Sequence, residues 1–480
     1  MQMVQRPQEG RQRLARARGR DDERVPPRGD RLPALALWAG RLGERLGEPL
    51  TDEWKELRHT RSLYLYPVGV RRGEAEVIVV GGGPAGALAA LALARRGVDA
   101  LVLDKKRFPR DKPCGGGIRY GVYRRFPDLA AHLRAKVAIH EIRRVLMESP
   151  GGHSVVASGD GPFYLTLRRT ELDAALLERA RAEGARVEQA VRVTGLEHVA
   201  GGLVVRCVDG RAFTGRVVIG ADGVNSVVAR AAGLTPGFAD ATLAIDTMEE
   251  TPLAELSMPE PDMMYVAYGY KGWPGYGYVF PKRDCVDFGV GFLVPFYKRV
   301  LAGPPYAHHA RFLAEAAARG VVRGRSNPDN FKAYRLPLGG PLPRTWADRV
   351  LVCGDAGGFV NAYTGEGIYH AMVTGRHAGE VAADAVTIGD CSAARLAEYE
   401  RRWREEIGEE LTDSVRIQRR LFANPALADA IIAAAAVDAR LCRLFALVAL
   451  GEASLRRHRL EMAWRFFLAR LRARWRRKRA

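Results

Sequence analysis

The chain has 480 residues and a formal net charge of +19, with 47% apolar and 27% charged side chains. These fractions are ordinary for a folded globular protein and exclude bulk disorder or a collagen-like repeat. The excess charge is concentrated at the ends, because residues 455–480 hold eleven basic side chains and one acidic. The middle of the chain is nearly neutral, so the sequence does not predict specific nucleic-acid binding.

Residues 1–74 are rich in Arg, Gly and Pro and predict a flexible basic extension. Their apolar stretch is too short and too far from the start for a signal peptide. No run of 18 residues lacks charge, so no membrane span is predicted. The six cysteines lie far apart without any Cys/His ligand spacing, which indicates reduced thiols and predicts no metal site.

The first ordered segment has the pattern of a dinucleotide-binding β-α-β unit. A buried strand at 77–80 is followed by a glycine-rich turn, a helix over 85–96 and a second buried strand over 98–103. The glycines allow a tight turn and close approach to a pyrophosphate, and an acid at the end of the second strand binds ribose hydroxyls. The residues predicted to hold the dinucleotide here are Gly81, Gly83, Pro84, Ala85, Gly86 and Asp104.

Three further segments indicate that the dinucleotide is FAD. Ala221-Asp222-Gly223 and Gly354-Asp355-Ala356 each follow a predicted strand, and Arg169 opens an Arg-x-x-Leu-Asp segment at a helix start. Together they resemble the FAD-binding pattern of p-hydroxybenzoate-hydroxylase-like flavoproteins, which implies that Asp355 binds the ribityl chain. A helix then begins at Gly365-Glu-Gly367-Ile368, and its positive N-terminus at the flavin edge would stabilise the anionic reduced flavin.

The loop after Asp104 carries the most specific motif. It contains basic residues, including Lys105 and Arg110, and then Cys114-Gly115-Gly116-Gly117. This loop resembles that of the geranylgeranyl reductase family, as do residues 335–367 and the later Asn-Pro segment at 424–425. The resemblance covers roughly residues 76–460. It implies an FAD-dependent oxidoreductase that saturates isolated C=C bonds of a polyprenyl chain, with NADPH or a ferredoxin-like protein as electron donor.

Aromatic residues between 265 and 292 predict the substrate wall. Tyr276, Tyr278 and Phe280 alternate on one face of a predicted strand that ends at Pro281. A sheet packing on its own core would give the same alternation. The geranylgeranyl reductase family, however, places Tyr-x-Trp-x-Phe-Pro at its lipid tunnel, which implies an isoprenoid lipid partner. The chain departs from that pattern at Tyr278, where the family has Trp, and at Ala362, where it usually has Pro.

The expected fold class is α/β, with an FAD-binding Rossmann-like domain built from discontinuous segments, an α+β substrate domain containing an antiparallel sheet, and a helical C-terminal region. The expected segments are 75–150, 151–235 and 346–390 for the FAD domain, 236–345 for the substrate domain, 391–454 for C-terminal helices and 455–480 for a basic helix. The helical patterns within this region run over 366–386, 393–420, 425–449 and 452–478.

The catalytic chemistry is less constrained by the sequence. The resemblance implies hydride delivery from reduced FAD, and an unactivated alkene leaves positioning and water exclusion as the means of catalysis. Cys114 is the candidate proton donor or redox-active thiol, with a small residue that merely fits the loop as the alternative. His370 is interpreted as a structural helix histidine.

Three other functions remain open. One is a monooxygenase or halogenase of the same fold, and another is a membrane-associated electron-transfer flavoprotein, although the cysteine spacing supplies no iron–sulfur ligands. The third is nucleic-acid binding by the charged tails.

The tail itself has an amphipathic pattern. Apolar residues recur at helical spacing at Leu460, Trp464, Phe467, Leu468, Leu471 and Trp475, with arginines between them. The pattern predicts either a helix in an anionic membrane interface or a helix packed on the body with a solvated basic end. The first reading implies a cytoplasmic enzyme held peripherally on the cytoplasmic membrane. The oligomeric state is not predicted.

Overall fold

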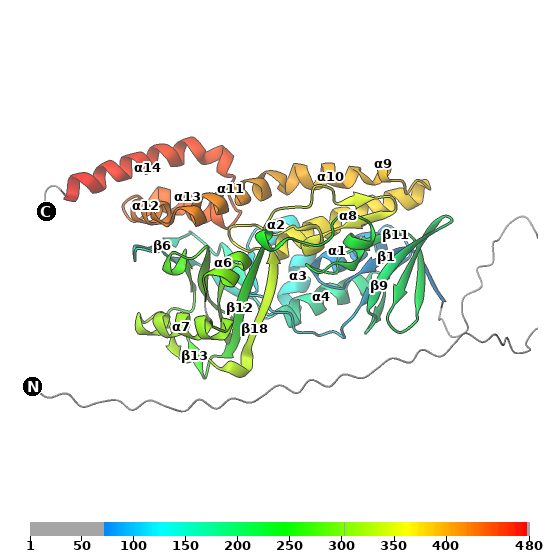
Figure 1. The fold of residues 1–480 in the computed structure, drawn as a ribbon, viewed down its shortest axis with the longest axis horizontal. Helices are drawn as coiled ribbons and strands as arrows, with labels where there is room; N and C mark the ends of the chain where they lie inside the picture. The colour runs from blue at the N-terminus through cyan, green and yellow to red at the C-terminus, as the bar shows by residue number, and fades with distance from the viewer. Residues whose placement is uncertain (1–71, 302, 478–480) are drawn as a thin grey trace, which may run out of the picture. The chain divides into compact units, whose positions relative to one another are not determined.

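The computed structural model describes residues 72–301 and 303–477 (Figure 1). Residues 1–71, most of the predicted basic extension, lie outside the described residues. The described chain combines a parallel sheet with flanking helices, a mainly antiparallel sheet, and a helical C-terminal region. The predicted α/β fold class is therefore confirmed. In the described part, no helix is both long enough and apolar enough to cross a membrane.

The parallel sheet has β1 (Arg72–Val80) at its centre, between β11 (Ala212–Gly220) and β2 (Ala100–Asp104). Val80 pairs with both Leu103 and Gly220, so the carboxyl ends of the three strands meet at one edge of the sheet. Their Val, Ile and Leu runs are buried on both faces, as in parallel sheets generally. The parallel strands β8 (Arg186–Gln189) and β20 (Val350–Val352) extend this sheet. Three antiparallel strands complete it, namely β19 (Trp346–Ala347), β10 (Gly202–Cys207) and β9 (Val193–Val199).

Helices α1 (Pro84–Ala94) and α8 (Ile368–Ile388) pack closely against each other beside this sheet. The approach requires small residues, because a Cβ atom at Gly375 would lie 2.0 Å from the Ala85 carbonyl oxygen. A hydrophobic core forms between the sheet, these helices and α4 (Arg169–Ala182). The helix that follows the Gly365 turn is thereby fixed over the glycine-rich turn.

The second sheet contains the aromatic strand β15 (Gly275–Pro281). Helix α7 (Pro305–Ala318) covers one face, since a Cβ atom at Gly277 would lie 2.3 Å from the Phe312 ring. The other strands are β18 (Phe331–Pro337), β12 (Leu243–Pro252), β16 (Cys285–Leu293), β14 (Met263–Tyr268), β5 (Arg144–Glu148) and β6 (Ser154–Ser158).

Strands β5 and β6 differ from the expected division of the chain. Their residues lie in the segments 75–150 and 151–235 that were assigned to the FAD domain, yet β5 pairs in parallel with β14 of the second sheet. A small sheet of β3 (Gly117–Arg119), β7 (Tyr164–Thr166) and β4 (His140–Ile142) lies before and after them in the chain. Short strands carry no signal for their sheet, because any exposed sheet edge satisfies their backbone groups.

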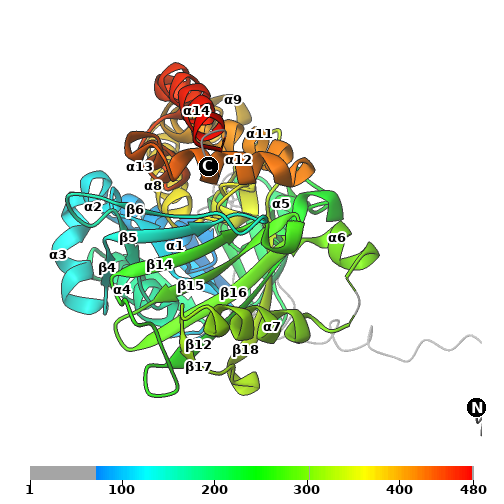
Figure 2. The same cartoon turned by 90° about the vertical axis from the view of Figure 1, so that its left-hand side faces the viewer.

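The C-terminal region is more divided than its helical pattern predicted. The pattern over 393–420 forms α9 (Ala393–Leu396), α10 (Glu398–Trp403), a π-helical turn (Arg404–Gly408) and α11 (Glu409–Ala423). The pattern over 425–449 forms α12 (Pro425–Ala435) and α13 (Ala439–Ala449), because Asp438 caps a new helix through the Leu441 amide. Asn424, the residue before α12, makes no side-chain capping bond. Helix α14 (Leu455–Arg477) lies outside α12 and α13, on the side away from the second sheet (Figures 1 and 2).

Candidate active site

The glycine-rich turn lies at the carboxyl ends of β1, β2 and β11. Gly81 has a φ of +104°, and a Cβ atom there would lie 2.3 Å from the Ala221 carbonyl oxygen. A Cβ atom at Gly86 would lie 1.8 Å from the Gly81 carbonyl oxygen. Both positions therefore require glycine for the turn to close against its neighbours. Pro84 and Ala85 begin α1, whose amide groups face the turn.

Asp104 is fixed at the end of β2. Its carboxylate accepts hydrogen bonds from the Gly82 and Lys106 amides, both at 2.7 Å. The side chain is buried, which places one carboxylate beside the glycine turn as the sequence predicted for a ribose-binding acid. Lys105, the next residue, is exposed. Its contact with the cofactor stays a prediction.

Two arginines meet one buried aspartate beside the turn. Arg169 makes a bidentate ion pair with Asp173, with both N–O distances 2.8 Å, and Arg110 reaches the same carboxylate at 2.9 Å. Burial alone would raise the pKa of Asp173, but Arg169 and Arg110 outweigh burial and hold its pKa below the ordinary value. The group keeps an excess of one positive charge.

This arginine pair fits an anionic ligand at the turn. A Cβ atom at Gly83 would lie 3.3 Å from Nη2 of Arg110, so the arginine lies close against the turn. The Nη1 group of Arg110 is buried without a hydrogen-bond partner among the described residues. A buried unpaired guanidinium N–H is costly, and a phosphate oxygen is its best acceptor. The residues present therefore fit the pyrophosphate of FAD.

Asp222 and Asp355, both predicted to contact the cofactor, have different surroundings. The Asp222 carboxylate accepts hydrogen bonds from Ser226, the N-cap of α5 (Val227–Ala231), and from the Val227 and Val228 amides at the start of that helix. Asp355 lies in a short 3-10 turn with its carboxylate 3.5 Å from Nζ of Lys112. Of these two carboxylates, only that of Asp355 is therefore available to a cofactor. It lies beside the start of α8, since a Cβ atom at Gly367 would be 3.5 Å from its Oδ1.

The Cys-Gly-Gly loop runs from the arginine pair to the aromatic strand. The Cys114 thiol accepts a hydrogen bond from the Gly116 amide at 3.4 Å and lies beside the Arg169 guanidinium. A Cβ atom at Gly115 would lie 3.1 Å from the Tyr278 ring and 3.3 Å from the Phe280 ring. Gly117 then begins β3. The loop thus brings Cys114 between the predicted cofactor residues and the predicted substrate wall.

The aromatic face of β15 meets the start of α8. Tyr276, Tyr278 and Phe280 contact one another in sequence, with ring centroids 6.1 and 4.7 Å apart. The Tyr276 hydroxyl donates to the Thr364 carbonyl, and a Cβ atom at Gly365 would lie 2.9 Å from that hydroxyl. Burial raises the pKa of Tyr276 and of Tyr278 well above the ordinary value, so both hydroxyls stay neutral and can donate hydrogen bonds.

Two neighbours complete this face. The Tyr278 hydroxyl donates to Asp246 at 3.5 Å, and burial raises the pKa of Asp246 to about 7, although Tyr278 and Lys112 partly oppose the shift. At the end of β15, the Pro281 carbonyl accepts a hydrogen bond from Thr166. Asp246 had not been singled out from the sequence, because an acid on a strand carries no signal of its eventual burial.

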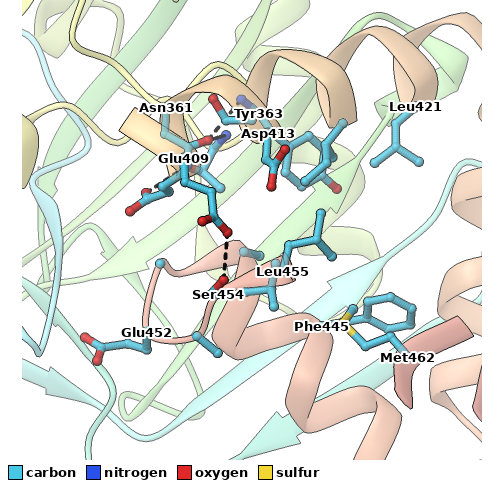
Figure 3. A pocket seen from close by; sticks show the side chains of 18 of the residues that line it. Asn361, Tyr363, Glu409, Asp413, Leu421, Phe445, Glu452, Ser454, Leu455 and Met462 are labelled. Atoms are coloured by element: carbon cyan, nitrogen blue, oxygen red, sulfur yellow. Dashed lines mark hydrogen bonds between the residues drawn. The ribbon is translucent and has the colours of Figure 1, made fainter. Parts of the chain in front are cut away.

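A cavity of about 500 Å³ begins next to this aromatic face (Figure 3). Tyr268 and Tyr363 stack in its wall with centroids 5.2 Å apart, and Tyr268 also contacts Tyr276 at 6.2 Å. Its acidic side chains include Glu409, Glu410, Asp413 and Glu452, and its apolar ones include Ile417, Leu421, Leu427, Ile431, Phe445, Val448 and Met462.

A hydrogen bond spans part of the cavity wall. The Ser454 hydroxyl donates to the Glu409 carboxylate at 3.0 Å and so connects the turn before α14 to α11. This cavity was not predicted, because its wall combines helices whose apolar faces look alike in sequence.

A buried ion-pair network joins the cofactor side to the cavity. Arg119 of β3 pairs with Glu366 at the start of α8 and with Glu410 of α11, whose oxygens lie 2.7 and 2.8 Å from its guanidinium nitrogens. His370 bonds Glu410 at 3.0 Å and the Glu366 carbonyl at 3.1 Å, so it is a satisfied helix histidine as expected.

This network was missed by sequence reasoning, because its members lie far apart along the chain. Glu366, His370 and Glu410 place ligand atoms within 4.8 Å of one another. The Arg119 guanidinium already supplies the cation among them, so the cluster is not a metal site. Burial alone would raise the pKa of Glu410, but His370 and Arg119 hold it well below the ordinary value. Glu410 is therefore a carboxylate and not a proton donor.

Comparison with known proteins agrees with this geometry. Residues 74–415 match the family model described as an FAD binding domain. A digeranylgeranylglycerophospholipid reductase from Methanocaldococcus jannaschii is 30% identical over 356 residues, which are 72% of this chain and 86% of the relative. A second such reductase, from Methanopyrus kandleri, is 32% identical over 364 residues, or 70% and 83% of the two chains.

Solved structures share the fold. A geranylgeranyl bacteriochlorophyll reductase-like protein from Thermoplasma acidophilum superimposes with a TM-score of 0.68 at 20% identity, covering 77% of this chain and 93% of that one. A flavin-dependent brominase superimposes with a TM-score of 0.57 at 18% identity, covering 75% and 92%. The fold and the turn thus define a flavoprotein of the FAD-binding-domain class. Within that class, the chain belongs to the geranylgeranyl reductase family of FAD-dependent oxidoreductases.

Proposed function

We propose that the protein saturates isolated C=C bonds in a geranylgeranyl-type chain carried by a lipid. The single observation that supports this substrate class most strongly is the cavity of about 500 Å³. It begins at Tyr268, Tyr363 and Thr364, one ring away from Tyr276, and continues among apolar side chains of α11, α12 and α13. A polyprenyl chain offers only hydrocarbon to contact, and the apolar part of this wall is suited to it.

The chain's own residues would hold the cofactor at the near end of this cavity. Arg110 and Arg169 carry the positive charge for a pyrophosphate, Asp104 accepts ribose hydroxyls, and Asp355 lies beside the start of α8. When bound, reduced FAD supplies the hydride equivalent for the reduction. The positive N-terminal end of α8, behind Gly365, Gly367 and Ile368, favours a negative charge at that edge.

The side chains of the protein would contribute substrate positioning and one proton to the reaction. An isolated alkene develops no oxyanion, so an oriented substrate and a dry pocket are what the side chains contribute. Tyr276, Tyr278 and Phe280 would form the wall against which the alkene lies, with Pro281 closing the strand. Cys114, between the arginine pair and this wall, would deliver the proton to the second alkene carbon. NADPH or a ferredoxin-like protein would be the electron donor.

The test is direct. The purified flavoprotein is reduced with dithionite without oxygen and incubated with a digeranylgeranylglycerophospholipid dispersed in detergent, and the lipid is examined by mass spectrometry. Each saturated bond is expected to add about 2 Da. Reoxidation of the flavin without any gain in lipid mass would overturn the proposal. Substrate-dependent oxygen consumption would instead identify a monooxygenase or halogenase of the same fold.

A further inference from the structure

Helix α14 has one face that is packed on the protein. Met462, Phe466 and Ala469 form a small core with Leu441 and Leu444 of α13, and Met462 and Ala469 are almost fully buried. Ion pairs fix the helix from its flank, since Glu461 lies 3.0 Å from Arg440 and Asp438 lies 3.2 Å from Arg465. The packed helix predicted as one alternative for residues 455–480 is therefore present, within the described residues 455–477.

The outer face of the same helix is apolar and exposed. Leu460, Trp464, Phe467 and Leu471, here called the apolar stripe, are exposed by 78%, 62%, 55% and 43%. They account for four of the nine large apolar side chains exposed in the described part of the chain. Their spacing of four, three and four residues places them on one side, and the rings of Trp464 and Phe467 stack at 6.1 Å. The side chain of Trp475 lies outside the described residues.

Arginines border this stripe. Five are exposed on the described part of the helix, namely Arg456, Arg457, Arg459, Arg470 and Arg472. Arg456 lies 3.8 Å from Glu409, whereas the other four have no ion pair with a described carboxylate. A stripe of Trp, Phe and Leu flanked by unpaired guanidinium groups has the chemistry of a helix in a bilayer interface. Its complement is an apolar layer covered by phosphates.

Other occupants match this face less well. Nucleic acid would satisfy the arginines and leave Leu460, Trp464 and Phe467 exposed to water. A second copy of the chain, related by a twofold axis, would bring its own arginines against these. An anionic bilayer satisfies both parts of the face at once, because acyl chains accept the apolar stripe and lipid phosphates accept the arginines.

The packed face of α14 also reaches the cavity. Leu455 and Met462 line the cavity of about 500 Å³, and they equally line an open groove of about 910 Å³ between α11 and α14. Phe445 and Leu427 belong to both hollows. The groove continues along α14 past Arg459 and Phe466. A lipid leaving the bilayer beside this helix would therefore meet a groove toward the aromatic strand, lined by apolar side chains and by charged ones such as Arg416 and Arg420.

We propose that α14 docks on an anionic bilayer through the apolar stripe and its arginines, and that the prenyl lipid enters from the membrane along the adjoining groove. The docking step does not depend on the reaction. The entry step rests on the proposed function.

Vesicle binding tests the docking step. The full-length holoprotein is sedimented with phosphatidylcholine vesicles that contain or lack phosphatidylglycerol. We expect binding to the anionic vesicles that falls with added salt, and a loss of about tenfold or more in Trp464→Ser/Phe467→Ser and in Arg470→Gln/Arg472→Gln. Val208→Ser and Arg283→Gln/Arg299→Gln, at exposed sites elsewhere, serve as matched controls and should bind as the parent does.

Equal binding of all variants, or self-association through the stripe without vesicle binding, would overturn the docking proposal. Unchanged flavin content and melting temperature show that each variant is folded.

Turnover separates the entry step from the proposed reaction. Trp464→Ser/Phe467→Ser should reduce detergent-dispersed lipid at the parental rate and lose about tenfold with lipid embedded in anionic vesicles. Equal rates on vesicles would refute membrane delivery while leaving alkene reduction intact. No mass gain in detergent, for the parent protein, would refute the reaction while leaving docking intact.

Discussion

The two ends of the candidate active site are built by different kinds of contact. At the cofactor end, backbone atoms of Gly81, Gly86 and Ala221 approach so closely that no Cβ atom fits between them. At the lipid end, α11, α12, α13 and side chains of the second sheet line about 500 Å³ with apolar and acidic groups. Close contacts between backbone atoms therefore determine the structure of the cofactor end, whereas the volume of the cavity determines what the lipid end can hold. We expect one added methyl group to disrupt the cofactor end, and a larger change of side-chain volume to be needed at the lipid end.

The largest effect is expected at the glycine turn. Gly86→Ala places a Cβ atom 1.8 Å from the Gly81 carbonyl oxygen, so α1 must separate from β1. We expect a loss of about 3 kcal/mol or more in stability together with loss of bound flavin. Visible absorbance of the purified protein and urea unfolding measure both. Gly195→Ala, where a Cβ atom meets nothing within 4 Å, is the matched control, and equal flavin content in the two would contradict this account.

At the junction of the two ends, Cys114→Ala tests the proposed proton donor. The variant should keep its flavin, because the loop and Arg169 are retained, and should lose about 100-fold in alkene turnover under anaerobic single-turnover conditions. If the variant keeps both the parental turnover and its full flavin content, Cys114 is not the proton donor and is only a small residue that fits the loop.

At the lipid end, Leu421→Trp adds volume inside the cavity. We expect about a tenfold rise in KM for the prenyl lipid, since the added ring competes with one or two methylene positions of the chain. Dithionite reduction of the flavin should be unaffected. Leu253→Trp, at an exposed position, is the control. A KM that does not change would mean that the substrate takes another path.

A further effect concerns the pH dependence of stability. Burial disfavours the charged form of Asp246 and raises its pKa from the ordinary 3.8 to about 7. The folded state therefore binds this proton more tightly, so the associated stability is complete below about pH 4 and is lost as pH rises through about 7. Asp246→Asn should remove up to about 3 kcal/mol of this loss between pH 5 and pH 8. Urea unfolding at pH 5 and pH 8 should show a flatter profile in the variant than in the parent or in exposed Asp329→Asn. Parallel profiles would contradict the assignment.

Much of the cofactor end could be predicted from sequence because its signals are local. The turn after β1 and the acid ending β2 lie within one β-α-β unit, and their spacing follows from strand and helix lengths. The carboxylate of Asp222 shows the limit of such reasoning. Its motif marks a strand end correctly, but whether the side chain faces a cofactor or bonds amides at the start of α5 depends on the turn that follows.

The lipid end required the tertiary structure. Arg119, Glu366 and Glu410 form one buried network from three distant segments, and no spacing along the chain announces it. Strand β5 pairs with β14 of the second sheet, and Val145 and Met147 share a core with Met264 and Val266, a partnership that no spacing along the chain indicates. Helix α14 gives the clearest division. The sequence by itself determined that residues 455–477 form a basic amphipathic helix, since apolar spacing and charge are properties of one segment. Only the packing of Met462, Phe466 and Ala469 on α13 decided which face is buried and left Trp464 and Phe467 outside, because that choice depends on the surface the helix meets.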